Sequence, residues 1–211
     1  MELNEPLIPT CPPQAQAVRV SHSTDYKGFF LKVTLFILIF TLSFHFPNLI
    51  PKIQNRQQTI QEIFEVLERY STGLASAMKE ELAEVIYEEA TRNNHDPKFI
   101  LALIAIESSF QNWSVSHRGA KGLMQIMPYV AQSLAQEMGI EWSGDRTLFN
   151  PFLNIKMGTY YLSQLIFDFD DIRLALTAYN YGPSYVKGLK EKKKQIPSHY
   201  YQKVFTVYQS L

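Results

Sequence analysis

The sequence predicts a mainly α-helical domain preceded by an N-terminal transmembrane helix. Three observations support this fold class. Apolar residues recur every three or four positions along most of the chain, which is typical of amphipathic helices. No alternating stretch is long enough to predict a major sheet. Residues 29–46 form an almost continuous apolar run that comes before the periodic part of the chain.

Residues 1–27 lead into this apolar run and are rich in proline. Such a segment buries little apolar surface, so we expect a disordered tail. The only cysteine, Cys11, lies in this tail. A single cysteine excludes an intramolecular disulfide and a cysteine-based metal cluster. A lipoprotein is also excluded, because its cysteine would have to follow the apolar run.

The apolar run predicts a transmembrane signal anchor over residues 28–50. About twenty helical residues cross the apolar part of a bilayer. Lys32 near one end can reach the headgroups, and His45 stands near the other end. No small-residue cleavage site follows, which favours an anchor that is not removed. A buried core helix is the alternative, but the rest of the chain supplies its own apolar faces.

Residues 51–78 predict a helical linker. Ile53, Ile60, Ile63 and Leu67 recur at helical spacing among polar residues. This helix could pack on the following domain or act as a spacer, and the sequence does not decide between the two.

Residues 79–211 predict one domain of helices joined by short loops. Asp96 and Pro97 mark a helix start, because aspartate caps free amide groups and proline suits the first helical position. The helix that follows is apolar nearly all round from Phe99 to Ile106, so we expect it at the centre of the domain. Pro128 predicts the start of another helix.

The charge balance argues against nucleic acid as a partner. The chain has 20 Lys and Arg against 20 Asp and Glu, a formal net charge of zero. Binding to nucleic acid normally needs a basic excess. The basic run Lys190–Lys194 is interpreted as a solvated helix end. Contact with an anionic polymer or lipid headgroups is the alternative for that run.

Three blocks in the domain carry polar residues and glycines in a distinctive order. Glu107 follows the apolar helix, residues 119–128 contain a stretch bracketed by glycines, and Tyr179-Asn180 lies close before a glycine. Together the blocks resemble the lytic transglycosylases that cleave bacterial peptidoglycan, whose soluble-lytic-transglycosylase (SLT) domain is related to goose-type lysozyme. The resemblance covers most of the chain beyond the apolar run and implies a lysozyme-like helical fold.

By resemblance, Glu107 is the catalytic residue and acts as a general acid. Burial in an apolar pocket raises a carboxyl pKa from about 4.3, so that the proton is retained at neutral pH. The alternative is a surface glutamate at a helix end. The resemblance implies these substrate-binding residues: Ser116, Gly122, Met124, Gln125, Met127, Tyr179, Asn180 and Tyr200.

The residue types in these blocks suit a sugar ligand. Glycine lets the backbone approach a ligand closely. Methionine offers adaptable apolar surface to a sugar face, and glutamine both donates and accepts hydrogen bonds. By resemblance, Ser116, the Tyr179 hydroxyl and the Asn180 amide would hold either the acid or the acetamido group of the substrate. The alternative is structural: a tight turn with core methionines, and a Tyr-Asn pair that only joins helices.

Other matches to the family are interpreted as scaffold. Asn154 would tie a loop down, and Gly158 would allow close helix packing. One departure lies near the end of the domain, where Ile196 and Pro197 replace an acidic residue and a threonine that many members carry. The polar contact of that acid is missing here, although Tyr200 still fits the family pattern.

A mechanism with one acid fits the sequence better than one with two carboxylates. Other acids, such as Asp145 and Asp171, fall outside the three blocks. By resemblance, Glu107 would protonate the β-1,4 bond between N-acetylmuramic acid and N-acetylglucosamine. The resulting carboxylate would take the proton of the muramyl C6 hydroxyl, and a 1,6-anhydro ring would close. No metal and no cofactor are expected.

Two other functions stay open. A goose-type lysozyme-like hydrolase would share the fold but use water as the acceptor. An inactive wall-binding module would keep the groove without cleaving. The expected partner is the peptidoglycan glycan strand, so the domain must lie outside the bacterial cytoplasmic (inner) membrane, with the N-terminal anchor holding it there. The sequence identifies no protein partner.

Overall fold

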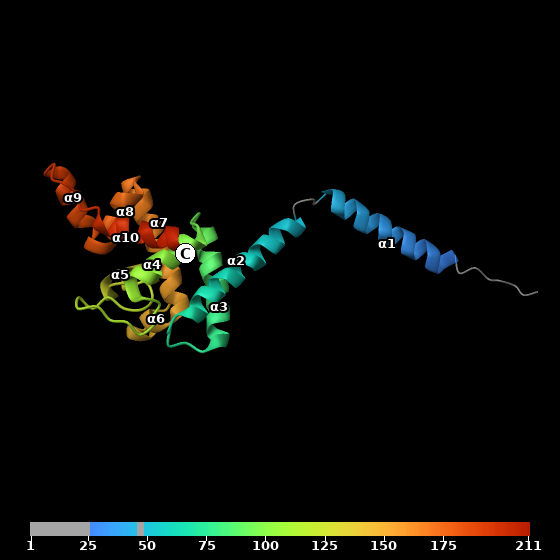
Figure 1. The fold of residues 1–211 in the computed structure, drawn as a ribbon, viewed down its shortest axis with the longest axis horizontal. Coiled ribbons are helices and arrows are strands. Elements are labelled where there is room, and N and C mark those ends of the chain that lie inside the picture. The colour runs from blue at the N-terminus through green and yellow to red at the C-terminus, as the bar shows by residue number, and fades with distance from the viewer. Residues whose placement is uncertain (1–25, 46–48) are drawn as a thin grey trace, which may run out of the picture. The chain divides into compact units, whose positions relative to one another are not determined.

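The structure is a computed structural model, and it describes residues 26–45 and 49–211. Within these ranges, extended pairing is limited to isolated bridges that Lys121 makes with Val115 and Ile126. The prediction of a mainly α-helical domain is confirmed, and the predicted tail falls almost wholly outside the described residues. The helices (Figure 1) are α1 Tyr26–His45, α2 Leu49–Arg69, α3 Ser76–Arg92, α4 Pro97–Ser108, α5 Pro128–Met138, α6 Asp145–Phe149, α7 Pro151–Phe169, α8 Ile172–Tyr181, α9 Pro183–Glu191 and α10 His199–Ser210.

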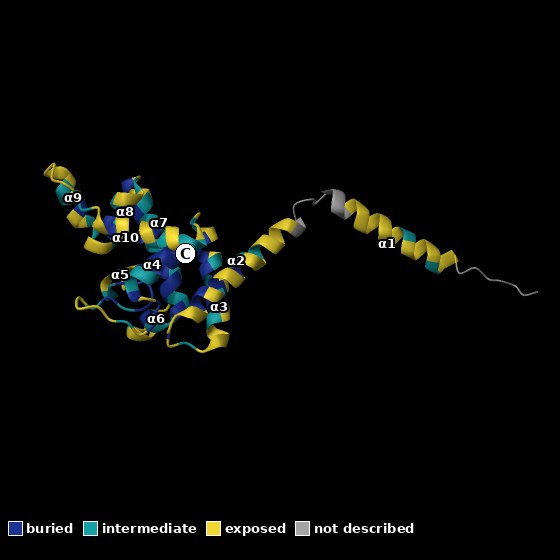
Figure 2. Ribbon diagram, viewed as in Figure 1, coloured by how far each residue is buried: buried dark blue, intermediate teal, exposed yellow. Residues whose placement is uncertain are grey.

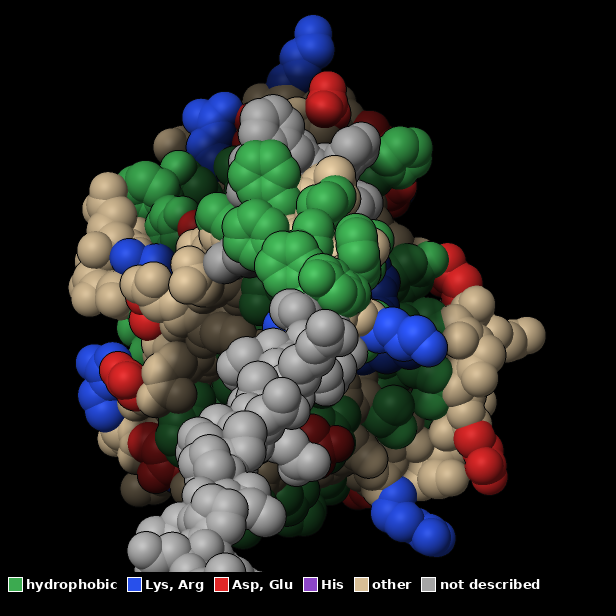
Figure 3. All heavy atoms as spheres, turned by 90° about the vertical axis from the view of Figure 1, so that its right-hand side faces the viewer, with side chains coloured by type: hydrophobic (Ala, Val, Ile, Leu, Met, Phe, Trp, Pro, Cys, Tyr) green, Lys and Arg blue, Asp and Glu red, His purple; other side chains and the backbone are tan. Residues whose placement is uncertain are grey.

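The chain divides into two compact units after Leu49, and helix α1 belongs to the first. Apolar side chains gather on its surface (Figure 3). In the described ranges, no helix is both long enough and apolar enough to cross a membrane. The predicted span over residues 28–50 is therefore not confirmed, and residues 46–48 of it lie outside the described residues. The exposed apolar side chains are Phe29, Phe30, Leu31, Leu35, Phe36, Ile37, Leu38, Ile39 and Phe40.

The second half of helix α2 packs on the domain. Ile60, Ile63, Val66 and Leu67 are buried in the same apolar core as residues of α3 and α4. The first half of α2 also contacts α3, because Arg56 forms an ion pair with Glu88 of that helix at 3.1 Å. Of the two alternatives for the predicted linker, packing on the domain is the one the structure shows for the second half.

Helix α4 is a central element of the domain, as its apolar sequence predicts. The Asp96 carboxylate caps its start by accepting a hydrogen bond from the Lys98 amide at 2.9 Å, and Pro97 is its first residue. Residues Ile100 to Ile104 are buried (Figure 2). The helix packs against α3 and α10. Because these helices surround it, the residues at its C-terminal end are held in a fixed position.

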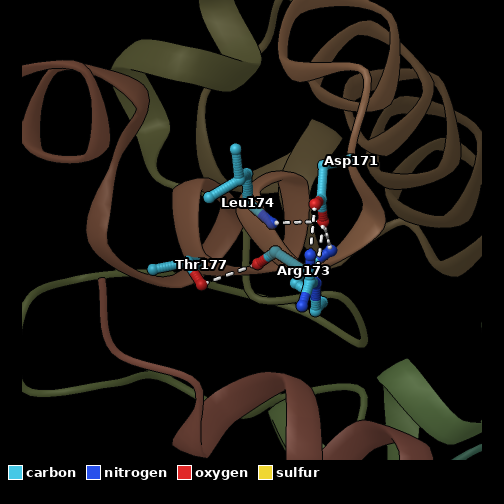
Figure 4. A network of polar contacts seen from close by, with 4 residues as sticks. All are labelled: Asp171, Arg173, Leu174 and Thr177. Carbon is cyan, nitrogen blue, oxygen red and sulfur yellow. Dashed lines mark hydrogen bonds and ion pairs between the residues drawn. The ribbon is translucent and has the colours of Figure 1, made fainter. Parts of the chain in front are cut away.

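Helix α8 is fixed at its N-terminal end (Figure 4). The Asp171 carboxylate accepts hydrogen bonds from the Arg173 and Leu174 amides at 2.8 and 3.4 Å. The side-chain hydrogen bond from Arg173 lowers the pKa of Asp171 to about 2. One turn on, the Thr177 hydroxyl donates to the Arg173 carbonyl at 2.7 Å. Gly182, at a φ of 92°, ends the helix, and α9 begins directly after it.

Candidate active site

Glu107 lies in the last turn of α4 and lines a cleft of about 410 Å³. The chain turns sharply behind it, because Ser109 and Phe110 adopt left-handed backbone at φ values of 52° and 63°. The Phe110 side chain is fully buried and anchors this turn. Burial raises the pKa of Glu107 from its ordinary value to about 7. The carboxyl group therefore keeps its proton to a higher pH than an exposed glutamate does.

Tyr200 is the residue that contacts this carboxyl group. It lies in the first turn of α10, only 6% exposed, and its hydroxyl donates a hydrogen bond to Oε1 of Glu107. This bond favours the carboxylate and so opposes the effect of burial on the pKa of Glu107. Burial, and then the nearby Glu107 charge, raise the pKa of Tyr200 well above its usual range. Tyr200 therefore stays a hydrogen-bond donor at any working pH.

The glycine-bracketed loop is held in place by Asn154 of α7. Its side-chain amide donates to the carbonyls of Lys121 and Leu148 at 3.1 and 2.9 Å. Its carbonyl accepts from the Met124 amide at 2.8 Å. Asn154 is fully buried. The expectation that Asn154 ties a loop down is confirmed.

Two of the predicted binding residues belong to the scaffold instead. The Met124 side chain is fully buried, so the predicted contact of this side chain with a sugar is wrong. It packs where Gly158 lacks a side chain, since a Cβ there would stand 2.8 Å from the Cβ of Met124. Gly122 is also buried, and a Cβ on it would meet Asn154 and stand 2.5 Å from the Leu148 carbonyl oxygen. The close approach at Gly122 is therefore to Asn154 rather than to a ligand.

The other predicted residues of the loop line the cleft beside Glu107. Ser116, Gln125 and Met127 all contribute to its wall. The Gln125 amide donates to the carbonyls of Ser114 and Gly122 at 3.0 and 2.8 Å, which fixes the orientation of the side chain. The Ser116 hydroxyl oxygen accepts from a loop amide at 2.9 Å, and its own proton is still available for a ligand.

Tyr179 and Asn180 of α8 also line the cleft. The Tyr179 hydroxyl donates to the Met124 carbonyl at 2.8 Å, so its proton is used on the loop and not on Glu107. Burial, with a smaller contribution from the Glu107 charge, raises the pKa of Tyr179 well above its usual range. Asn180 is exposed, and its side-chain amide is accessible to a ligand.

A smaller cavity of about 140 Å³ continues the cleft and shares much of its wall, including Gln125 and Asn180. Tyr129 and Tyr161 are added to the wall there. The two cavities therefore form one groove, and Glu107 lines its larger cavity. The sequence interpretation missed other residues of this groove. The missed lining residues are His117, Arg118, Ala120, Ile126, Tyr129, Val130, Tyr161, Tyr181 and Gly182.

Comparison with known proteins identifies the domain. A model of the transglycosylase SLT domain matches residues 84–201. The chain belongs to this family. Over 117 residues it is 31% identical to the membrane-bound lytic murein transglycosylase C of Actinobacillus pleuropneumoniae, covering 54% of this chain and 32% of that protein. Over 119 residues it is 35% identical to the membrane-bound lytic murein transglycosylase F of Desulfosudis oleivorans, covering 53% and 24%.

The SLT domain also has a counterpart among solved structures. The 70 kDa soluble lytic transglycosylase of Escherichia coli superposes with a TM-score of 0.54 and 23% sequence identity, over 72% of this chain and 29% of that one. This likeness shows that the two share a fold. The chain spans about a third or less of the length of these relatives.

Among the described residues, Glu107 is the only acid that lines the groove of the SLT domain. Asp145 pairs with Lys121 at 2.5 Å, and Asp171 caps α8. Within the same described part of the chain, no three potential ligands are grouped as a metal site. Among the described lining residues, Glu107 is thus the one that offers a carboxyl group for proton transfer.

The departure at Ile196 and Pro197 has a structural role in this SLT domain. Ile196 packs against the smaller apolar cluster under α8 and α9. The Pro197 carbonyl accepts a hydrogen bond from the Thr177 hydroxyl at 3.0 Å. The segment before α10 is thereby tied to α8, and Tyr200 is held in position over Glu107.

Proposed function

We propose that this chain is a peptidoglycan lytic transglycosylase that cleaves the β-1,4 bond between N-acetylmuramic acid and N-acetylglucosamine. One observation carries the proposal: a single, partly buried glutamic acid with a pKa of about 7 lines a groove made of cavities of about 410 and 140 Å³. The names of the relatives support murein as the substrate class.

Glu107 serves both steps of the proposed reaction. In its protonated form it donates its proton to the glycosidic oxygen, and the bond from that oxygen to the muramyl anomeric carbon breaks. The acetamido group of the substrate stabilises the anomeric centre. The Glu107 carboxylate then accepts the proton of the muramyl C6 hydroxyl, whose oxygen bonds to the anomeric carbon. A pKa near 7 suits one residue to both roles, because neither form is strongly disfavoured.

The competing reaction is hydrolysis of goose-lysozyme type. It needs a water molecule as acceptor, and a second carboxylate to activate this water is the usual arrangement. The lack of a second acid among the described lining residues favours closure of the anhydro ring.

The test of the proposed activity is release of soluble muropeptides from purified murein sacculi by the full chain. Glu107→Gln keeps the shape of the side chain but cannot transfer a proton, so we expect a loss of at least about 10²- to 10⁴-fold. Glu141→Gln, an exposed glutamate outside the groove, is the matched control and should be as active as the native chain. A native chain that binds sacculi and releases nothing would support the wall-binding module instead.

We also propose that α1 attaches the chain to the cytoplasmic membrane, with the SLT domain on the outer side. The proposal is supported by the exposed apolar side chains of this helix, which water solvates poorly. Of the three relatives described above, the enzymes of Actinobacillus pleuropneumoniae and Desulfosudis oleivorans are named membrane-bound, and the enzyme of Escherichia coli is named soluble. Membrane fractions washed with alkaline carbonate should retain the full chain. Recovery of the full chain in the wash would contradict the attachment.

A further inference from the structure

Arg118 occupies a position in the groove that the proposed reaction does not use. It lines both cavities, at the place where they join. The backbone around it is a tight turn, since the Gly119 amide donates to the Ser116 carbonyl and the Ser116 amide donates to the Ala120 carbonyl, both at 2.9 Å. The base of the Arg118 side chain is therefore held in one place relative to Glu107.

The guanidinium group of Arg118 is available for a ligand. Within residues 26–45 and 49–211, no hydrogen bond, ion pair or ring contact engages this side chain. The other cation of the same loop, Lys121, is fully engaged: it pairs with Asp145 at 2.5 Å and lies over the Phe149 ring at 5.9 Å. One loop thus holds one cation that stabilises the fold and one that faces the groove.

The charge of the groove favours an anionic ligand group near Arg118. Among its described lining residues, only Glu107 and Arg118 belong to the Asp, Glu, Lys and Arg types. When Glu107 carries its proton, as the first reaction step requires, Arg118 is the remaining full charge of these types. An arginine fork matches the two oxygens of a carboxylate.

We propose that Arg118 binds a carboxylate on the muramyl residue of the substrate and so makes cleavage selective for strands that carry this charge. The inference rests on the proposed function and concerns the same groove. The muramyl residue can supply a carboxylate from two sources. In stripped strands the lactyl group ends in a free carboxylate. In substituted strands the lactyl carboxyl is joined to a peptide, which brings carboxylates of its own.

The experiment compares kcat/KM of the full chain on four substrates: stripped strands, stripped strands with the carboxylate converted to the amide, peptide-bearing strands, and peptide-bearing strands amidated in the same way. Arg118→Gln should lower kcat/KM roughly ten- to a hundredfold on at least one carboxylate substrate, and not on its amide. Arg118→Lys should recover only part of the loss, because lysine lacks the fork. Arg146→Gln, an exposed arginine outside the groove, is the matched control.

The outcomes separate the two sources and the two proposals. A charge-dependent loss on stripped strands identifies the lactyl carboxylate, and one only on substituted strands identifies the peptide. Equal losses on acids and amides, or no loss on any substrate, would overturn the inference while leaving the cleavage activity in place.

Binding to a chain that cannot cleave tests Arg118 independently of the reaction. In the Glu107→Gln background, Arg118→Gln should weaken binding of the carboxylate strands, measured by calorimetry, by the same factor. If the native chain cleaves nothing but this difference is found, the proposed reaction fails and the carboxylate site stands. If Arg118→Gln does not weaken binding of the carboxylate strands, the proposed carboxylate site is wrong.

Discussion

At the scale of single residues, the site depends on how its surroundings set the protonation of Glu107. Burial raises the pKa of this carboxyl group to about 7, and the hydrogen bond from Tyr200 acts in the opposite direction. The sequence placed Glu107 correctly at the end of an apolar helix. Its contact with Tyr200 joins residues far apart in the chain, and local patterns do not encode such a contact.

Tyr200→Phe should change the pH dependence of cleavage. Only protonated Glu107 can donate, so kcat/KM should fall as the pH rises through about 7. Loss of the Tyr200 hydroxyl removes a bond that favours the carboxylate, so the falling limb should move to higher pH. The other titratable or charged groups among the described residues of this cleft are Tyr179, Tyr181, His117 and Arg118. His117→Gln is the control. If this variant shifts the pH at which kcat/KM falls and Tyr200→Phe does not, the assignment of that fall to Glu107 is contradicted.

Glu107 should also lower the stability of the fold at neutral pH. Between pH 4.5 and about 7, the folded chain holds a proton that the unfolded chain has released. The free energy of unfolding therefore falls as the pH rises through this window. Glu107→Gln should raise Tm relative to the native chain above pH 7, and the difference should vanish near pH 4. A constant difference, or one matched by Glu141→Gln, would show that ionisation of Glu107 is not the cause.

At the scale of elements, helix starts were predictable and side-chain directions were not. Asp96-Pro97 begins α4 because capping chemistry lies within a few neighbouring residues. The direction of the Met124 side chain depends instead on a gap at Gly158 of α7. That gap exists only after the loop and the helix have packed together, so the sequence interpretation placed Met124 in the groove when it lies in the core.

Two glycines of the loop allow a matched test of its packing. Gly119 and Gly122 have similar φ values of 84° and 83°, but only at Gly122 would a Cβ collide with other atoms. Gly119→Ala should cost about 1–2 kcal/mol of unfolding free energy, from backbone strain alone. Gly122→Ala should cost clearly more, since it also displaces Asn154. Urea denaturation measures both, and equal losses would argue against the Asn154 contact.

Tyr179→Phe should act first on stability. It removes the hydrogen bond that joins α8 to the Met124 carbonyl, a loss of roughly 1–3 kcal/mol when the acceptor is left buried. Tyr161→Phe is the neighbouring control, because its ring packs on Tyr179 at 5.5 Å and its hydroxyl has no hydrogen bond within the described part of the chain. If Tyr179→Phe keeps its Tm and loses only turnover, the hydroxyl acts on the substrate instead.

At the scale of the whole molecule, one SLT domain carries the site, and α1 lies in a separate compact unit. Periodicity and three motif blocks were enough to predict the helical domain, because burial of apolar stripes dominates helix packing. The membrane span is a different kind of prediction, because it concerns contact with a lipid bilayer and not packing within the chain. It stays a prediction until the carbonate wash is done.

The central claim is that Glu107 closes an anhydro ring without water, and the origin of the oxygen in the product tests this most directly. The full chain is incubated with murein sacculi in water enriched in a heavy oxygen isotope, and the muropeptides are analysed by mass spectrometry. We predict muramyl ends that are lighter by one water than hydrolysed ends and that contain no heavy oxygen. Muramyl ends that have gained one heavy oxygen would contradict the claim and identify a hydrolase.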